Sequence, residues 1–306
     1  MGRRSKDVKY HNSILAPFAV YTGIHLVTAR VLRMSGVPED HVLMLAEKVP
    51  STISAVYTAT QAMKLFGIIG AADEKGADRS NHDNINSRDN LENKDLNQQK
   101  RKQFHWQQGW DQPQYSDEID RVFARHIGYT TYDLLVMMNK SHHPSAWVHH
   151  IFALFGTSAM RVFKQGAYFP TCFLPAEATV AITNVLYVVQ KYYPGSHNLI
   201  TLLLAIRCVM FTVFRFAAAP LCVTHALRNV TVLGADGKPR TNPTLMERIR
   251  AFSDKYFRTL HPVVSVGTCM NVAIFTGLNT WWTLLTYRAL WKHIKQGRAK
   301  LNIHHI

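Results

Sequence analysis

Gly128-Tyr129-Thr130-Thr131-Tyr132-Asp133 leads directly into the apolar run Leu134-Leu135-Val136-Met137-Met138, and the doublet His149-His150 leads directly into Ile151-Phe152-Ala153-Leu154-Phe155. Both runs are too apolar and too long for surface loops, so a carboxylate and two imidazoles are expected inside membrane spans. Ionisable side chains in a membrane are costly unless they face a cavity or a partner. Asp133, His149 and His150 are therefore the first candidate site residues.

The segment 139–145 between these two runs is short and polar and contains Pro144. Because proline cannot continue a helix, this segment should fold the two helices back on each other. Antiparallel neighbours of this kind would bring Asp133 and the histidine doublet to a similar depth.

The formal charge of +15 on 306 residues invites a nucleic-acid interpretation. However, the Lys and Arg residues lie mainly in tails and connectors beside apolar runs, where positive charge sets topology and attracts anionic lipid headgroups. There is no recognisable nucleic-acid-binding motif, so no nucleic-acid partner is expected. The four cysteines lie in apolar runs without CxxC spacing, which favours small buried filler over a disulfide framework or zinc site.

The long apolar runs predict an all-α fold, a polytopic membrane bundle of about seven transmembrane helices of roughly 20 residues each. The strand-like alternation of a membrane barrel is absent, and only helices or closed barrels satisfy the backbone in lipid. The predicted spans are 14–32, 51–71, 122–138, 147–163, 167–190, 199–228 and 262–291.

These spans divide the chain into a basic N-terminal tail (1–13), two first helices (14–71), a polar insert (72–120), the remaining bundle (121–292) and a basic C-terminal tail (293–306). The middle of the insert has almost nothing to bury, so alone in water it should be disordered. Trp106 and Trp110 at its end suit a membrane interface or a contact with neighbouring subunits. Basic residues flank both termini, which an odd number of spans places on opposite sides, so the orientation stays open.

Adjacent histidines point about 100° apart on a helix, whereas metal sites on helices favour histidines at i and i+3 or i+4. We therefore expect no metal and no cofactor. A nearby Asp133 could instead orient one of the histidines as a general base. The alternative is a buried polar network that fixes the packing of the helices without chemistry.

The fifth and sixth spans add Glu177, Asn184, Arg207 and Arg215 to the candidate residues. A rise of about 1.5 Å per residue allows their depths to be compared across antiparallel helices. Asp133, the histidine doublet, Asn184 and Arg207 then form a shallower polar layer that would grip a lipid headgroup. Glu177 and Arg215 meet near the bilayer middle, where an ion pair between them would close the pocket floor.

With these residues in view, the chain resembles the TLC-domain superfamily, the TRAM, Lag and CLN proteins of eukaryotic membranes. The resemblance covers most of the chain. It rests on six pieces in order: Val49-Pro50-Ser51-Thr52-Ile53-Ser54-Ala55, Gly128-Tyr129 with Tyr132-Asp133, Val148-His149-His150-Ile151, Glu177 with Asn184, Phe214-Arg215-Phe216 with Pro220, and Gly277-Leu278-Asn279-Thr280-Trp281-Trp282.

The resemblance implies a lipid-facing membrane protein. It also implies a location in the endoplasmic reticulum, as for other members of the family. In the ceramide synthase branch the adjacent histidines are taken as catalytic, and His149 and His150 match that pair. Pro170 and Phe173 occupy the positions of two acidic residues of the synthases, and Ser54 occupies the position of a histidine in one of their early spans. The chain is therefore more similar to the non-synthase branch.

Three functions follow as expectations. The first is a protein that binds or handles a membrane phospholipid or sphingolipid in an intramembrane polar cavity without catalysis. The second is a structural subunit of a large membrane complex, for example in the mitochondrial inner membrane, that keeps the fold as a scaffold. The third is a sphingoid-base N-acyltransferase that uses acyl-CoA, with His149, His150 and Asp133 as catalytic residues.

Overall fold

The computed structural model describes residues 13–65, 115, 117–138, 143–234 and 236–303, and in these ranges the regular secondary structure consists of helices joined by turns and loops, with one isolated bridge between Leu233 and Pro239. The predicted all-α fold is confirmed. In chain order the helices are α2 (Leu15–Met34), α3 (Glu39–Leu65), α6 (Asp117–Met137), α7 (Pro144–Phe163), α8 (Tyr168–Phe173), η1 (Leu174–Glu177), α9 (Ala178–Tyr192), α10 (His197–Met210), η2 (Phe211–Phe216), α11 (Ala218–Asn229), α12 (Leu245–Thr259) and α13 (Pro262–Ile303).

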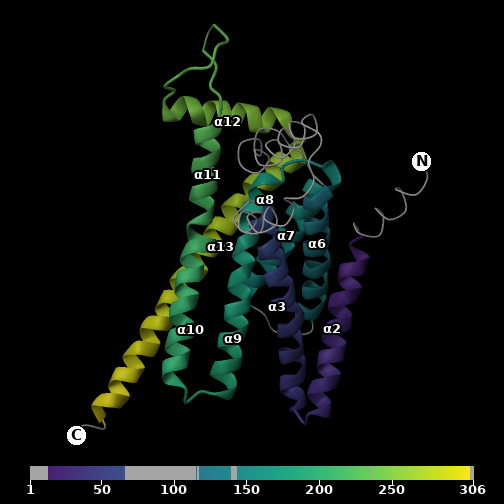
Figure 1. Cartoon of the computed structure of the whole chain (residues 1–306), viewed down its shortest axis with the longest axis vertical. Coiled ribbons are helices and arrows are strands. Elements are labelled where there is room, and N and C mark those ends of the chain that lie inside the picture. Colours follow the sequence, from purple (N-terminus) through teal and green to yellow (C-terminus); the bar gives the residue numbers. More distant parts are fainter. Residues whose placement is uncertain (1–12, 66–114, 116, 139–142, 235, 304–306) are drawn as a thin grey trace, which may run out of the picture.

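Most of these helices run side by side in one bundle, α13 crosses it at a slant, and α12 lies across one end (Figure 1). Helix α3 packs against α2, α6, α9 and η1, while α7 lies between α6 and α13. The long helix α13 also contacts α10 and η2. This arrangement brings α6, α7, η1, η2 and α13 around a common interior, where the candidate site lies.

Four helical segments of the described chain are long and apolar enough to cross a membrane: Leu15–Met34, Tyr168–Tyr192, His197–Asn229 and Pro262–Gly297. They correspond to the first, fifth, sixth and seventh predicted spans. The other three predicted spans correspond to α3, α6 and α7, which are helices of the same bundle but are not among these four segments. The count of seven spans therefore stays a prediction.

Prolines shape two of the long spans. Pro175 lies in η1, a 3-10 turn that separates α8 from α9 and ends at Glu177. Pro220 follows η2, a π-helical turn that contains Arg215 and separates α10 from α11. Proline lacks an N–H and its ring clashes with the carbonyl four residues earlier, so a widened turn before Pro220 relieves that clash. Both irregular turns thus carry an ionisable candidate residue.

Two glycines allow close approach of helices at the interior. A Cβ atom on Gly128 in α6 would lie 2.8 Å from the carbonyl oxygen of Ile14 and 2.9 Å from Cβ of Pro17, beside α2. A Cβ atom on Gly156 in α7 would lie 1.7 Å from Nδ2 of Asn271 in α13. The absence of a side chain at these positions lets α6 and α7 pack closely against α2 and α13.

Other sequence expectations meet the structure only in part. Most of the insert 72–120 and of the N-terminal tail lies outside the described residues. Helix α13 continues to Ile303, through the predicted boundary at residue 292. Cys172 and Cys208 are buried free thiols as expected, but Cys222 is half-buried and Cys269 is exposed on α13, so the expectation of buried filler was wrong for Cys269.

Candidate functional site

Asp133 and His150 form a direct contact between α6 and α7. The Nε2 atom of His150 lies 2.9 Å from Oδ2 of Asp133, and the two side chains are 18% and 11% exposed. A carboxylate at this distance fixes the orientation of the imidazole. The structure therefore brings together Asp133 and His150, which were predicted to lie at a similar depth on neighbouring helices.

His149, the other member of the doublet, points to a different set of neighbours. Its Nε2 atom lies 3.9 Å from Oε1 of Glu177, and both side chains are 14% exposed. Its ring contacts those of Phe275 and Trp282, with centroids 5.0 and 5.3 Å away. The Nδ1 atom of His149 is buried and makes no hydrogen bond within the described residues. His149 can therefore accept or donate one further hydrogen bond.

Arg215 is the most deeply placed cation of the site, with only 5% of the residue exposed. Its Nε donates to Oγ1 of Thr179 at 2.6 Å, and its Nη1 donates to Oδ1 of Asn279 at 2.9 Å. The expected direct ion pair with Glu177 is thus replaced by two hydrogen bonds to uncharged side chains. Glu177 still attracts the guanidinium electrostatically, and both residues line the same cavity.

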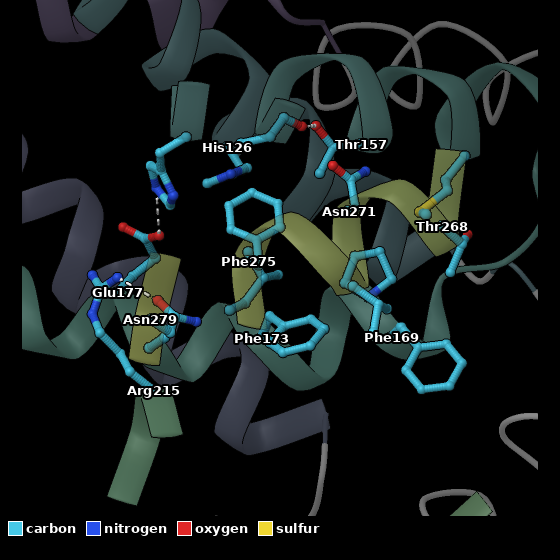
Figure 2. A pocket seen from close by; sticks show the side chains of 17 residues that line it. His126, Thr157, Phe169, Phe173, Glu177, Arg215, Thr268, Asn271, Phe275 and Asn279 are labelled. Carbon is cyan, nitrogen blue, oxygen red and sulfur yellow. Dashed lines mark hydrogen bonds and ion pairs between the residues drawn. The ribbon is translucent and has the colours of Figure 1, made fainter. Parts of the chain in front are cut away.

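The cavity lies between α6, α7, α8, η1, η2 and α13, and the empty space between its side chains is about 590 Å³, including the part open to the surroundings. Figure 2 shows Glu177, Arg215 and Asn279 together at one side, with Phe275 and Phe173 beside them and Phe169 further along. The cavity thus combines a cluster of charged and polar groups with a mainly aromatic and aliphatic wall. Its remaining lining residues are His126, His149, Ala153, Thr157, Met160, Pro170, Leu174, Ala176, Thr268, Asn271 and Val272.

Asn184 and Arg207 do not line this cavity. The Nδ2 atom of Asn184 donates to Oγ of Ser51 at 3.3 Å and to Oγ1 of Thr52 at 2.9 Å, which ties α9 to α3. The guanidinium of Arg207 lies 5.0 Å from the centroid of the Phe211 ring, and its buried Nε has no hydrogen-bond partner in the described part of the chain. The single shallow layer expected from depth is therefore not formed, because these two residues face other neighbours.

No role was predicted from the sequence for His126, Thr179, Asn271 or Asn279, and of these only Asn279 lay in a stretch that resembles the family. His126 precedes Asp133 by seven residues, two helical turns, and the asparagines on α13 are eight residues apart, so each pair shares a helix face. This periodicity was the available signal. Thr179 gave none, because a threonine inside a membrane span usually bonds to its own helix.

No group of three or more His, Cys, Asp or Glu side chains in the described ranges is arranged to hold a metal ion. The expectations of no metal and no cofactor stay predictions. What the geometry offers is a buried guanidinium, a carboxylate and an imidazole with a free nitrogen, all facing an apolar cavity. Such groups can bind a polar headgroup while the wall contacts an apolar chain.

Comparison with known proteins agrees with this description. The family model of the TLC domain matches residues 97–288, more than half of the chain. No curated protein and no solved structure was found to match. The matched range includes α6 to α11 and most of α13, and therefore every residue that lines the cavity. The chain belongs to the TLC-domain family of integral membrane proteins.

Proposed function

We propose that this TLC protein holds one membrane lipid in the cavity between α7, η1 and α13, without catalysing a reaction on it. The observation that carries the proposal is the buried guanidinium of Arg215, held beside Glu177 and His149 at a cavity whose wall is mainly apolar. A buried ionisable group inside a membrane bundle is a candidate for function by default.

Two features of the cavity match the two parts of a lipid. The unpartnered Nδ1 of His149 and the guanidinium of Arg215 offer hydrogen bonds to a polar headgroup. Phe169, Phe173 and Phe275 offer an apolar surface to an acyl chain. Apolar pockets with few convergent polar groups are the usual form of small-molecule sites.

The absence of catalysis is supported by the positions where the chain departs from the ceramide synthase pattern. Pro170 and Phe173, which stand in place of two acidic residues of that branch, both line the cavity. They present apolar groups where an acid or base would have to contact a substrate. Such a wall suits a bound acyl chain and lacks the two carboxyl groups that the synthase pattern places there.

Native mass spectrometry of the protein purified from membranes in mild detergent tests the proposal. We expect a complex with one bound lipid, and we expect Ala153→Trp to abolish it by filling the cavity, since Ala153 lines it and is 7% exposed. Ala273→Trp is the matched control, because Ala273 is exposed on α13, one of the helices that line the cavity. Equal lipid retention in wild type and Ala153→Trp would refute the cavity as the binding site.

A second candidate function is N-acyl transfer from acyl-CoA to a sphingoid base, favoured by the 2.9 Å contact between His150 and Asp133. In that case Asp133 would hold the imidazole of His150, which would accept a proton from the amine as its nitrogen bonds to the thioester carbon. The C–S bond would break, and CoA would leave as the thiol with that proton. Acyl transfer by the purified protein that disappears in His150→Ala would replace the binding proposal with this one. An inactive wild type whose lipid is retained would support binding alone.

A further inference from the structure

Helix α12 lies outside the cavity and connects two membrane spans at the same end of the bundle. It follows the span that ends at Asn229 and precedes the span that begins at Pro262. Figure 1 shows it lying across the end of α11 rather than along the bundle. A helix between two span ends on one side must lie at the level of the lipid headgroups or beyond them.

The helix is specified by its own sequence. The Oγ1 atom of Thr244 accepts a hydrogen bond from the backbone N–H of Glu247 at 3.3 Å, and the backbone N–H of Thr244 donates to Oε2 of Glu247 at 2.7 Å. This reciprocal capping box satisfies two N–H groups at the start of the helix. Helix α12 is therefore an ordered element and not an extension of the preceding loop.

Contacts with the bundle fix the position of α12. The Nη1 atom of Arg248 donates to the backbone carbonyls of Leu227 at 3.2 Å and Arg228 at 2.9 Å, in the last turn of α11. These carbonyls have no partner within their own helix, and a cation there is favourable. Further along, Tyr256 and Phe252 pack on Phe169 of α8, with ring centroids 5.7 and 6.2 Å away.

The beginning of the same apolar face is uncovered. At 100° per residue, Leu245 and Ile249 share a helix face with Phe252 and Tyr256, and Met246 borders it. Leu245 is 63% exposed, Met246 72% and Ile249 38%. The apolar stripe of α12 therefore extends past the bundle, where water would contact it unless lipid does.

Basic side chains accompany this stripe. The segment 228–258 contains seven Lys and Arg residues and three Asp and Glu residues. Of the acidic ones, Glu247 is bound by Arg240 and Thr244, while Asp254 lies 3.9 Å from Arg258, whose side chain is 81% exposed. Arg250 is also exposed. Arg250 and Arg258 lie on the polar face, away from the apolar stripe, and basic residues on the polar face of a helix with an exposed apolar face are typical of helices that lie in the membrane interface.

We propose that α12 is an interfacial helix that binds the anionic phospholipids of the leaflet at this end of the bundle. Leu245, Met246 and Ile249 contact the upper part of the acyl chains, while Arg250 and Arg258 contact phosphate and carboxylate groups of the headgroups. Basic groups close to an anionic membrane surface are attracted to it. This inference does not depend on what the cavity binds.

Spin labels on the full-length protein test the depth of α12. A label at Met246→Cys and one at Asp254→Cys, in a background whose native cysteines are replaced by alanine, would be compared in vesicles of phosphatidylcholine with and without phosphatidylserine. We expect the label at 246 to be accessible to oxygen and shielded from an aqueous nickel reagent, and the label at 254 to show the reverse. Both proteins must unfold at the same temperature as the unlabelled background.

The recognition of anionic lipids by Arg250 and Arg258 is tested by a separate measurement. Adding phosphatidylserine should move the label at 246 deeper, and Arg250→Gln with Arg258→Gln should abolish that shift. A label at 246 that the nickel reagent reaches as readily as it reaches 254 would overturn the interfacial placement. Shielding of the label at 246 from both reagents would indicate that a second copy of the chain covers this face, and it would also overturn the proposal. A lipid-dependent shift that persists in the double variant would refute recognition of the lipids by these arginines.

Discussion

The Nε2 atom of His149 in α7 lies 3.9 Å from Oε1 of Glu177 at the end of η1. This contact places an imidazole and a carboxylate from two different spans at the same cavity, where Arg215 supplies a cation from a third. The histidine doublet thus connects Asp133, expected at the shallower depth, with Glu177, expected at the greater depth, because His150 turns towards Asp133 while His149 turns towards Glu177. The two histidines of the doublet therefore contact different carboxylates, His150 that of Asp133 and His149 that of Glu177.

Arg215→Leu should destabilise the protein strongly. The substitution removes two hydrogen bonds, to Thr179 and Asn279, and leaves the half-buried Glu177 without the cation that attracts it. Loss of one partner from a buried charged group typically costs about 3–5 kcal/mol, so the unfolding temperature in detergent should fall by several degrees.

Arg207→Leu is the matched control for that measurement. Arg207 lies on the same span, but its Nε has no hydrogen-bond partner in the described residues, and its guanidinium stacks on Phe211. A leucine keeps the apolar contact, so a small change in unfolding temperature is expected. A loss as large as that of Arg215→Leu would show that the hydrogen bonds of Arg215 do not account for its contribution.

Gly128→Ala should destabilise the protein although alanine usually favours a helix by about 0.5–1 kcal/mol. The added methyl group would meet the backbone of α2 at 2.8 Å, and a backbone atom cannot rotate away. Gly277→Ala in α13 meets nothing within 4 Å and should be neutral or stabilising. Thermal unfolding of both variants checks this, and equal effects would contradict the close packing of α6 on α2.

Asp120 should make the free energy of unfolding depend on pH in the acidic range. It lies in the first turn of α6, ahead of the span predicted from residue 122, and accepts hydrogen bonds from Nε of Arg161 at 3.1 Å and from Lys164. Burial alone would raise the pKa of Asp120, but the hydrogen bonds from Lys164 and Arg161 outweigh it and hold the pKa below its ordinary value.

The sign follows from linkage. A carboxyl whose pKa is lowered by folding stabilises the folded state above the unfolded pKa of about 4, and this contribution is lost as pH falls through the folded pKa. The wild type should therefore lose more stability than Asp120→Asn when the pH is lowered from 7 to below about 4. Parallel unfolding curves for the two proteins across this range would exclude the contribution.

Several relationships could be predicted from the sequence because they depend on distance along a helix. Pro144 and the apolar runs gave antiparallel α6 and α7, and the rise per residue then brought Asp133 to His150. Depth does not fix rotation about the helix axis, however. Asn184 therefore turned towards α3, and Arg207 towards Phe211.

The partners of Arg215 could not be predicted, for two physical reasons. The π-helical turn before Pro220 rotates Arg215 relative to an ideal helix, so its direction is not given by residue counting. Its hydrogen-bond partners Thr179 and Asn279 are uncharged and do not stand out within apolar spans. Charge pairing was the visible signal in the sequence, and it predicted a direct ion pair with Glu177, whereas the structure makes Glu177 a neighbour that lines the same cavity.

The central claim, that a membrane lipid occupies the cavity, is tested most directly by photocrosslinking with a phospholipid and a sphingolipid that carry a diazirine in the acyl chain. We predict labelling of Phe173 and Phe275 inside the cavity, lost in Ala153→Trp, together with labelling of the outward-facing Val266 that is unchanged in the variant. Labelling confined to outward-facing residues such as Val266, and equal in wild type and Ala153→Trp, would contradict the claim.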